Sequence, residues 1–358
     1  MKKTSKAKNL LKGDFLTYLL VIVVYAVFQF MIANGSLGSL YEGLLVPVCI
    51  YVIMALALNL VVGIVGELSL GHAGFMCVGA FSGAIFSKIT ADMITTDLLR
   101  FVLAILVGAV TAAVFGFLIG IPVLRLNGDY LAIVTLAFGE IIKNVMNVIY
   151  LGVDEKGLHF SMKDELALNL AEGGKTIVKG PQGIIGTPHN STFTIGVVLI
   201  LITLVIVLNL IHSRSGRAIM AIRDNRIAAE SIGINITKYK MMAFVISAAL
   251  AGVAGVLYSH NISSLQAQPQ NFGYNMSIMI LVYVVLGGIG NMRGSIIAAA
   301  ILTVLPEMLR EFQDYRMLMY AIVLILMMLF NWAPACRRFR ERYSLKRIFA
   351  KKNTKEAQ

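Results

Sequence analysis

The chain has 358 residues, of which 58% are hydrophobic and only 14% charged, with a mean hydropathy of +0.80. Soluble domains carry about a quarter charged residues, so this composition excludes an ordinary soluble domain and indicates a membrane protein. The net charge of +12 does not indicate nucleic acid binding. The basic residues gather at both ends of the chain and in one central stretch, as the positive-inside rule predicts for cytoplasmic segments.

Ten apolar segments follow one another along the chain, most of them long enough for a membrane-spanning helix. They are residues 15–33, 44–63, 73–89, 99–124, 129–150, 192–211, 241–260, 276–290, 295–309 and 317–332. We therefore expect an all-α fold, a polytopic membrane protein with about ten transmembrane helices. The first segment lacks a small-residue cleavage site, so we expect a retained helix rather than a signal peptide.

The distribution of Lys and Arg predicts the topology. Most of the 31 basic residues lie inside if both termini are cytoplasmic, with residues 1–14 and 333–358 as basic tails. We expect one membrane-embedded domain over residues 1–358. Residues 151–191 then form an external segment, either a docking surface for another protein or a solvated cap, because ordered connections of this length tend to be functional.

The central stretch at residues 212–240 reads HSRSGRAIMAIRDNRIAAESIGINITKYK and is polar between two apolar segments. Its alanines favour helix, and Asp224 with Asn225 interrupts them, so we expect two short helices that meet there. Gly233 is expected to end the second helix. Ala228 and Ala229 predict a small-residue face that another surface could approach closely. The stretch is either a cytoplasmic docking hairpin or an amphipathic connection on the membrane surface.

No arrangement of residues predicts catalysis. The chain has no G-x-x-x-x-G-K-[ST] loop for phosphate, and its five histidines and three cysteines show no metal-ligand or disulfide spacing. We therefore expect no enzyme activity, no metal, no cofactor and no nucleic acid partner.

Polar residues within or beside the apolar segments are candidates for an internal pathway, because such residues are costly in lipid. The candidates are Asn59, Glu67, Ser69, His72, Thr135 and Glu140. The glycine-rich stretch 66–74 is either a broken helix along the pathway or a tight inner loop at the membrane surface. Glu140 lies about 16 Å along its helix, near the bilayer centre. Lys143 follows three residues later and is close enough to pair with it.

Four stretches resemble one family of transport proteins. Ala228-Ala229-x-x-x-Gly233 resembles the coupling motif of ABC importer permeases, with Ile227 where that motif has Glu. Three further stretches are similar to signatures of branched-chain amino acid permeases: NLVVGIVGELSLGHAGF at 59–75, LRLNGDYLAIVTLA at 124–137 and LGGIGNMRG at 286–294. The long outer segment resembles the LivM type rather than the shorter LivH type.

This resemblance implies a permease subunit of an ABC importer in a bacterial cell membrane, translocating leucine, isoleucine or valine. It implies four kinds of partner: a second, LivH-type permease, two ATPase subunits, an external solute-binding protein and the amino acid. The residues it implies for ATPase coupling are Arg217, Arg223, Asp224, Asn225, Ala228, Ala229, Glu230 and Gly233. The alternatives are the same architecture for urea, short amides or a sugar, an ion-coupled carrier, and a membrane-embedded enzyme.

Overall fold

The computed structural model describes residues 2–36, 38–91, 93–124, 129–154, 157–170 and 174–332. These residues fall into two compact units, Met1–Ala300 and Ile301–Gln358, and each is described by itself. The predicted tail at 333–358 and residues 125–128 of the second signature stretch lie outside the described residues.

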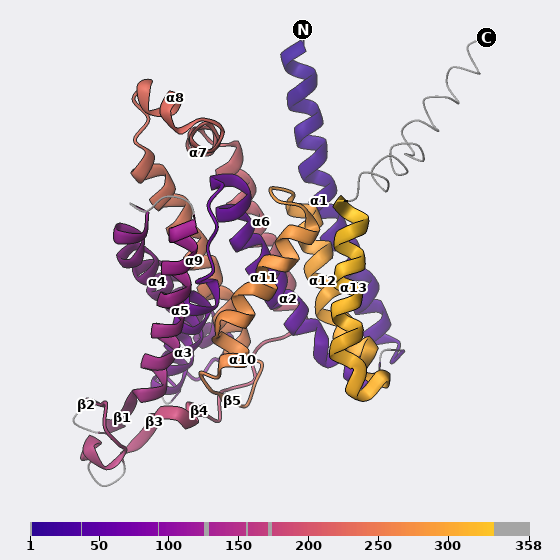
Figure 1. The fold of residues 1–358 in the computed structure, drawn as a ribbon. Helices are drawn as coiled ribbons and strands as arrows, with labels where there is room; N and C mark the ends of the chain where they lie inside the picture. The colour runs from indigo at the N-terminus through magenta and orange to yellow at the C-terminus, as the bar shows by residue number, and fades with distance from the viewer. Residues whose placement is uncertain are drawn as a thin grey trace. The chain divides into compact units, whose positions relative to one another are not determined.

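Each of the ten apolar segments lies on a helix (Figure 1). The helices are α1 (Lys2–Ala33), α2 (Ser39–Asn59), α3 (His72–Ile89), α4 (Asp97–Val123), α5 (Asp129–Val148), α6 (Phe193–His212), α9 (Ile236–Ser259), α11 (Tyr274–Gly287), α12 (Met292–Met308) and α13 (Arg316–Trp332). Among the described residues, seven helices are long and apolar enough to cross a membrane. The prediction of a polytopic helical membrane protein is confirmed, whereas the number ten and the orientation of the termini stay predictions.

The first unit is built around α9, which packs against α2, α3 and α4. Glycines allow these helices to approach closely. A Cβ added at Gly79 of α3 would clash with the backbone of Gly252 in α9, and one at Gly255 would clash with the carbonyl of Met76. Close packing through small residues is how membrane helices associate, because lipid provides no hydrophobic drive between them.

The second unit, as far as the structure describes it, contains the end of α12, a short 3₁₀ segment (Leu309–Tyr315) and α13. α13 carries an apolar stretch, Leu318–Leu329, that is shorter than the seven candidate spans. Within this unit, Arg310 donates a hydrogen bond of 2.8 Å to Glu307.

The predicted external segment, residues 151–191, departs from the all-α expectation. Strands β1 (Tyr150–Asp154), β2 (Gly157–Ser161) and β3 (Lys175–Lys179) form an antiparallel sheet in the order β2-β1-β3. β4 (Ile184–Ile185) pairs with β5 (Ser264–Leu265), which follows α9. These strands are short, and β3 and β5 pair with residues far away in the chain. Local sequence patterns therefore do not predict them.

Candidate functional site

The 212–240 stretch forms the hairpin expected from the sequence. α7 (Arg214–Asp224) and α8 (Arg226–Ser231) meet at Asn225, whose side-chain oxygen accepts a 3.0 Å hydrogen bond from the N–H of Ala228. Ser213 ends α6 and caps α7, its hydroxyl accepting from the N–H of Gly216 at 3.0 Å. Beyond α8, Gly233 has φ +83, the left-handed conformation that glycine adopts at helix ends. The predicted break at 224–225 and the stop at Gly233 are confirmed.

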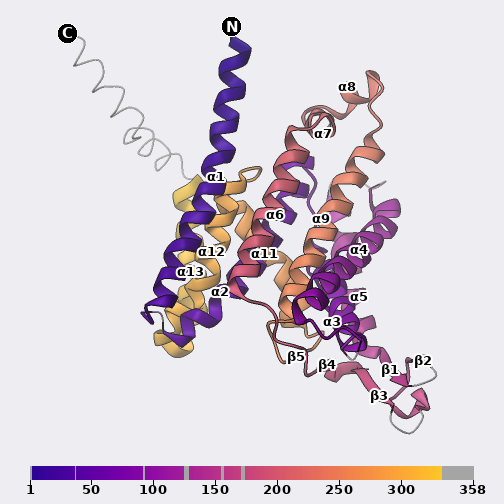
Figure 2. The ribbon, with the colours of Figure 1, turned by 180° about the vertical axis from the view of Figure 1, so that it is seen from behind.

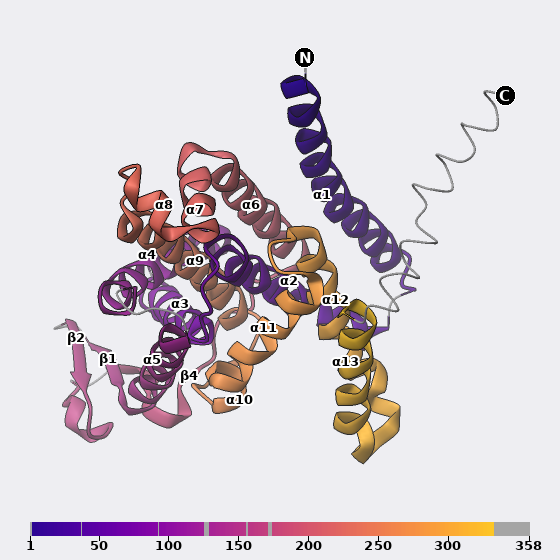
Figure 3. The same ribbon diagram turned by 45° about the horizontal axis from the view of Figure 1, so that its top comes forward.

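The hairpin lies at one end of the first unit and the β1–β3 sheet at the opposite end (Figures 1 and 2). The N-terminal end of α1 lies at the same end as the hairpin. Seen from that end, α7 and α8 lie between the ends of α6 and α9 (Figure 3). The two membrane helices are therefore the arms that carry the hairpin.

The surface of α8 differs from the expected small-residue face. Ala228 is exposed, but Ala229 is only 2% exposed and packs in a small cluster with Ile222 and Ile236. Its role is to hold α8 against α7 and the start of α9. The prominent side chains of the tip are Ile227 and Ile232, 80% and 74% exposed. We call residues 225–233 the hairpin tip.

Arg223 joins the hairpin to the membrane part of the unit. Its guanidinium donates a 2.7 Å hydrogen bond to the carbonyl of Gly63, and its aliphatic carbons lie against Gly66. Gly63 belongs to a π-helical segment (Leu60–Val65) at the end of α2. The guanidinium also pairs with Asp224 at 3.2 Å. A movement of α7 would therefore act directly on the end of α2.

A second link lies in residues 66–71 between the π-helical segment and α3, which we call the inner loop after its predicted side of the membrane. Glu67 in this loop forms an ion pair with Lys240 near the start of α9, and both side chains are largely buried. Stretch 66–74 is a short loop beside the hairpin that leads into α3. Its position relative to the membrane stays a prediction.

Asn59, Ser69 and His72 lie in what we call the polar seam, together with Ser247 and Ser295. All five side chains are buried. Asn59 donates to the Ser295 hydroxyl at 2.9 Å and accepts from the N–H of Gly290 at 2.8 Å. A Cβ at Gly63 would clash with the Gly290 backbone, so the glycine-rich stretches 62–66 and 286–290 pack directly on each other.

The other half of the seam is centred on His72. Its Nε2 lies 2.7 Å from the Ser247 hydroxyl, and its Nδ1 lies 3.4 Å from the Ser69 hydroxyl. Ser247 in turn donates to the carbonyl of Ala57. These hydrogen bonds tie α2, α3 and α9 together, and they satisfy polar groups that would otherwise be costly in the membrane interior.

Thr135 and Glu140 both lie on α5 and have different surroundings. The Thr135 hydroxyl accepts from the N–H of Leu70 at 3.0 Å and so supports the inner loop. Glu140 pairs with Lys143, as the sequence predicts. Its other oxygen accepts from the N–H of Tyr274 at 2.8 Å, which joins α5 to the start of α11. The Glu140 side chain remains 25% exposed.

Two exposed amides on α5 and α11 were not predicted from the sequence, and together with Glu140 we call them the polar strip. Asn144 of α5 and Asn275 of α11 are both exposed. Asn144 lies one turn after Glu140 on the same face of α5. Its position inside an apolar segment, four residues from a carboxylate, was the signal that could have identified it.

The β1–β3 sheet also carries exposed apolar side chains. Leu158 and Phe160 lie on the same face of β2 and are exposed. Leu166, in the 3₁₀ turn after β2, is exposed as well. Nearby, hydrogen bonds from Thr176 and Lys179 lower the pKa of Glu165 below its usual value. The Lys179 Nζ lies 3.1 Å from the Glu165 carboxylate.

The apolar helices, with a hydrogen-bonded polar interior and a charged hairpin at one end, define a multi-pass membrane protein. The profile of the family described as "branched-chain amino acid transport system / permease component" matches residues 40–330. The chain belongs to this family and is a bacterial inner-membrane permease subunit, not an enzyme.

Three curated relatives show how far the similarity extends. The high-affinity branched-chain amino acid transport system permease protein LivM of Salmonella typhimurium is 36% identical over 329 residues, 89% of this chain and 73% of that protein. LivM of Escherichia coli is 34% identical over the same shares. LivH of Salmonella typhimurium is 25% identical, over 78% of this chain and 88% of that protein. No solved structure matches the chain significantly.

Proposed function

We propose that this chain is the LivM-type permease of an ABC importer for branched-chain amino acids, and that the 212–240 hairpin receives the force of ATP hydrolysis. The observation that carries this proposal is the hairpin tip, where Ile227 and Ile232 are 80% and 74% exposed. Large apolar groups at an aqueous tip favour a protein partner. Arg223 and the Glu67–Lys240 pair then transmit its movement to α2 and α9.

The proposed topology has ten spans in a single membrane domain, with both termini and the hairpin in the cytoplasm and residues 151–191 outside. The opposite positions of the hairpin and the β1–β3 sheet support it (Figure 1). The external segment would dock a solute-binding protein, which is supported by the exposed Leu158, Phe160 and Leu166.

The proposed pathway lies along the polar strip of α5 and α11, between this chain and a LivH-type permease. Glu140 and Asn144 provide polar contacts there for an amino acid zwitterion. Asn59, Glu67, Ser69, Thr135 and His72 have partners inside the chain. We assign these five a positioning role beside the pathway rather than direct contact with the solute.

The test replaces both tip isoleucines in the assembled transporter, as Ile227→Asp with Ile232→Asp. We expect ATPase subunits to co-purify about tenfold less well, because charged groups replace apolar ones at the contact. ATPase activity stimulated by leucine-loaded binding protein should fall equally. Thermal unfolding should stay unchanged, since exposed substitutions usually change stability by less than about 0.5 kcal/mol.

The matched control is Met93→Asp, an equally exposed apolar residue in the loop that joins α3 to α4. It should leave ATPase binding and stimulated hydrolysis at the wild-type level. Normal coupling in the double isoleucine variant would contradict the proposal, as would amino acid uptake into liposomes that lack the ATPases.

A further inference from the structure

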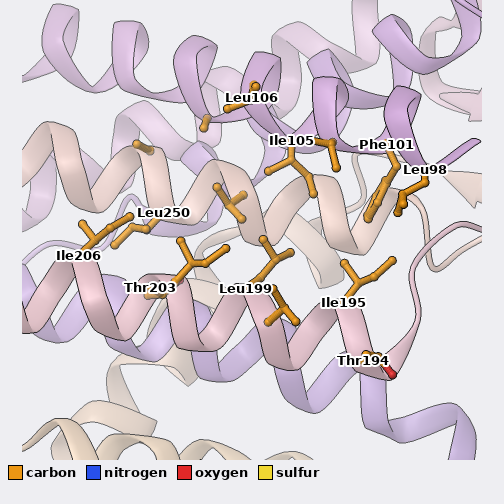
Figure 4. A pocket seen from close by; sticks show the side chains of 16 residues that line it. Leu98, Phe101, Ile105, Leu106, Thr194, Ile195, Leu199, Thr203, Ile206 and Leu250 are labelled. Atoms are coloured by element: carbon orange, nitrogen blue, oxygen red, sulfur yellow. The ribbon is translucent and has the colours of Figure 1, made fainter. Parts of the chain in front are cut away.

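An apolar cavity lies between α4, α6 and α9 (Figure 4), and none of its lining residues belongs to the hairpin tip or the polar strip. Its volume is about 490 Å³. The lining includes Leu98, Phe101 and Leu106 of α4, Ile195 and Ile206 of α6, and Leu250 of α9. The only side-chain polar atoms in the lining are the hydroxyls of Thr194 and Thr203.

The way the three helices pack explains why space remains. α4 packs closely against α9, and a Cβ at Gly252 would clash with the carbonyl of Gly108. α6 packs on α2 instead. The small side chains of Ala109 and Ala249 lie between these contacts and line the cavity. Voids lined by apolar atoms lose dispersion contacts, so an occupant would stabilise this region.

The face around the cavity is suited to lipid. α4 and α6 are both candidate membrane spans. Every exposed side chain of α4 between Leu98 and Ile121 is apolar, and so is every exposed side chain of α6 between Ile195 and Leu208. The exposed amides of α5 and α11 belong to helices toward the viewer in Figure 1, whereas α6 is toward the viewer in Figure 2.

We propose that this cavity binds one alkyl chain of a membrane lipid. Size excludes a whole transmembrane helix as the occupant. A transmembrane helix with a diameter of about 10 Å and a length of about 30 Å needs about 2,400 Å³, several times the cavity volume of about 490 Å³. A flexible alkyl chain can follow the narrow space between α4 and α6, and it leaves no polar group unsatisfied there.

The position of the bound alkyl chain has a consequence for transport. α6 and α9 are the two arms that carry the hairpin, so the lipid lies between the helices that must move when the hairpin is pulled. This consequence rests on the proposed function, whereas binding of the alkyl chain does not.

The test uses the assembled transporter in bilayers that contain phosphatidylcholine with a photoreactive group on one acyl chain. We expect adducts on the peptides of α4 and α6 that line the cavity. Ala109→Phe and Ala249→Phe should each block part of it and lower these adducts about tenfold, as when roughly two methylene groups lose their contact. Adducts on the exposed face of α1 serve as the internal reference.

Val114→Phe is the matched control, because it adds similar bulk to an exposed position of α4 outside the lining. It should leave the cavity adducts unchanged. Equal labelling of the two alanine variants and the wild-type protein would overturn the proposal. Absence of cavity adducts in the assembled wild-type transporter would overturn it too, because the partner permease would then cover this face. Neither outcome depends on transport.

Discussion

In the polar seam, Asn59, His72 and Ser247 are buried and hydrogen-bonded to groups on other helices. At the hairpin tip, Ile227 and Ile232 are apolar and exposed. The seam has polar side chains in an apolar interior, and the tip has apolar side chains on an exposed surface. In the seam, hydrogen bonds inside the chain compensate for burial of the polar groups. Within the described residues, nothing covers the two isoleucines. A polar group with all its partners inside the chain indicates a structural role, and an apolar group left uncovered in water indicates a partner.

The largest effect that tests this contrast is expected in the seam, from Asn59→Ala. The change leaves the Gly290 N–H without its acceptor and opens a small void. It should lower the free energy of unfolding by about 2–4 kcal/mol. Thermal unfolding of the purified protein measures this. Asn209→Ala, at an exposed amide of α6, is the control and should change stability by less than about 0.5 kcal/mol. Equal stability of the two variants would contradict the structural role assigned to the buried Asn59.

An intermediate effect is expected where the two regions meet, from Glu67→Gln. Lys240 would remain largely buried without its carboxylate, which should cost about 1–3 kcal/mol. The exchange Glu67→Lys with Lys240→Glu restores opposite charges and should recover part of the loss. A double-mutant cycle of unfolding free energies measures the coupling between the two residues. A coupling energy of zero would show that the pair does not hold the inner loop to α9.

The smallest effect is expected at the tip, from Gly233→Ala. Gly233 has φ +83, so a Cβ there costs about 1 kcal/mol. Because the tip has few contacts, we expect faster amide hydrogen exchange in residues 226–236 and little change elsewhere. Gly43→Ala in α2 is the control, since its Cβ would meet open space and alanine favours helix. Faster global unfolding of Gly233→Ala than of the wild-type protein would contradict a purely local effect at the tip.

Hydrophobic runs, helix caps and breaks are local properties. For this reason, the sequence alone predicted where the membrane helices lie within residues 15–332. It also predicted that α7 and α8 meet at Asn225 and that α8 stops at Gly233. The Glu140–Lys143 pair was also predictable because three residues separate its members on one helix. The family resemblance likewise rested on short local stretches of the sequence.

Only the tertiary structure decided which polar residues are bonded inside the chain. Asn59 meets Gly290 and Ser295 across more than 230 positions, and no local pattern announces such a partner. The pairing of β4 with β5 and the cavity between α4, α6 and α9 likewise depend on segments that are distant in sequence. The burial of Ala229 depends on how α8 packs onto Ile222 and Ile236. The physical reason is that periodicity determines which face of a helix is apolar, whereas packing against other helices determines what that face meets.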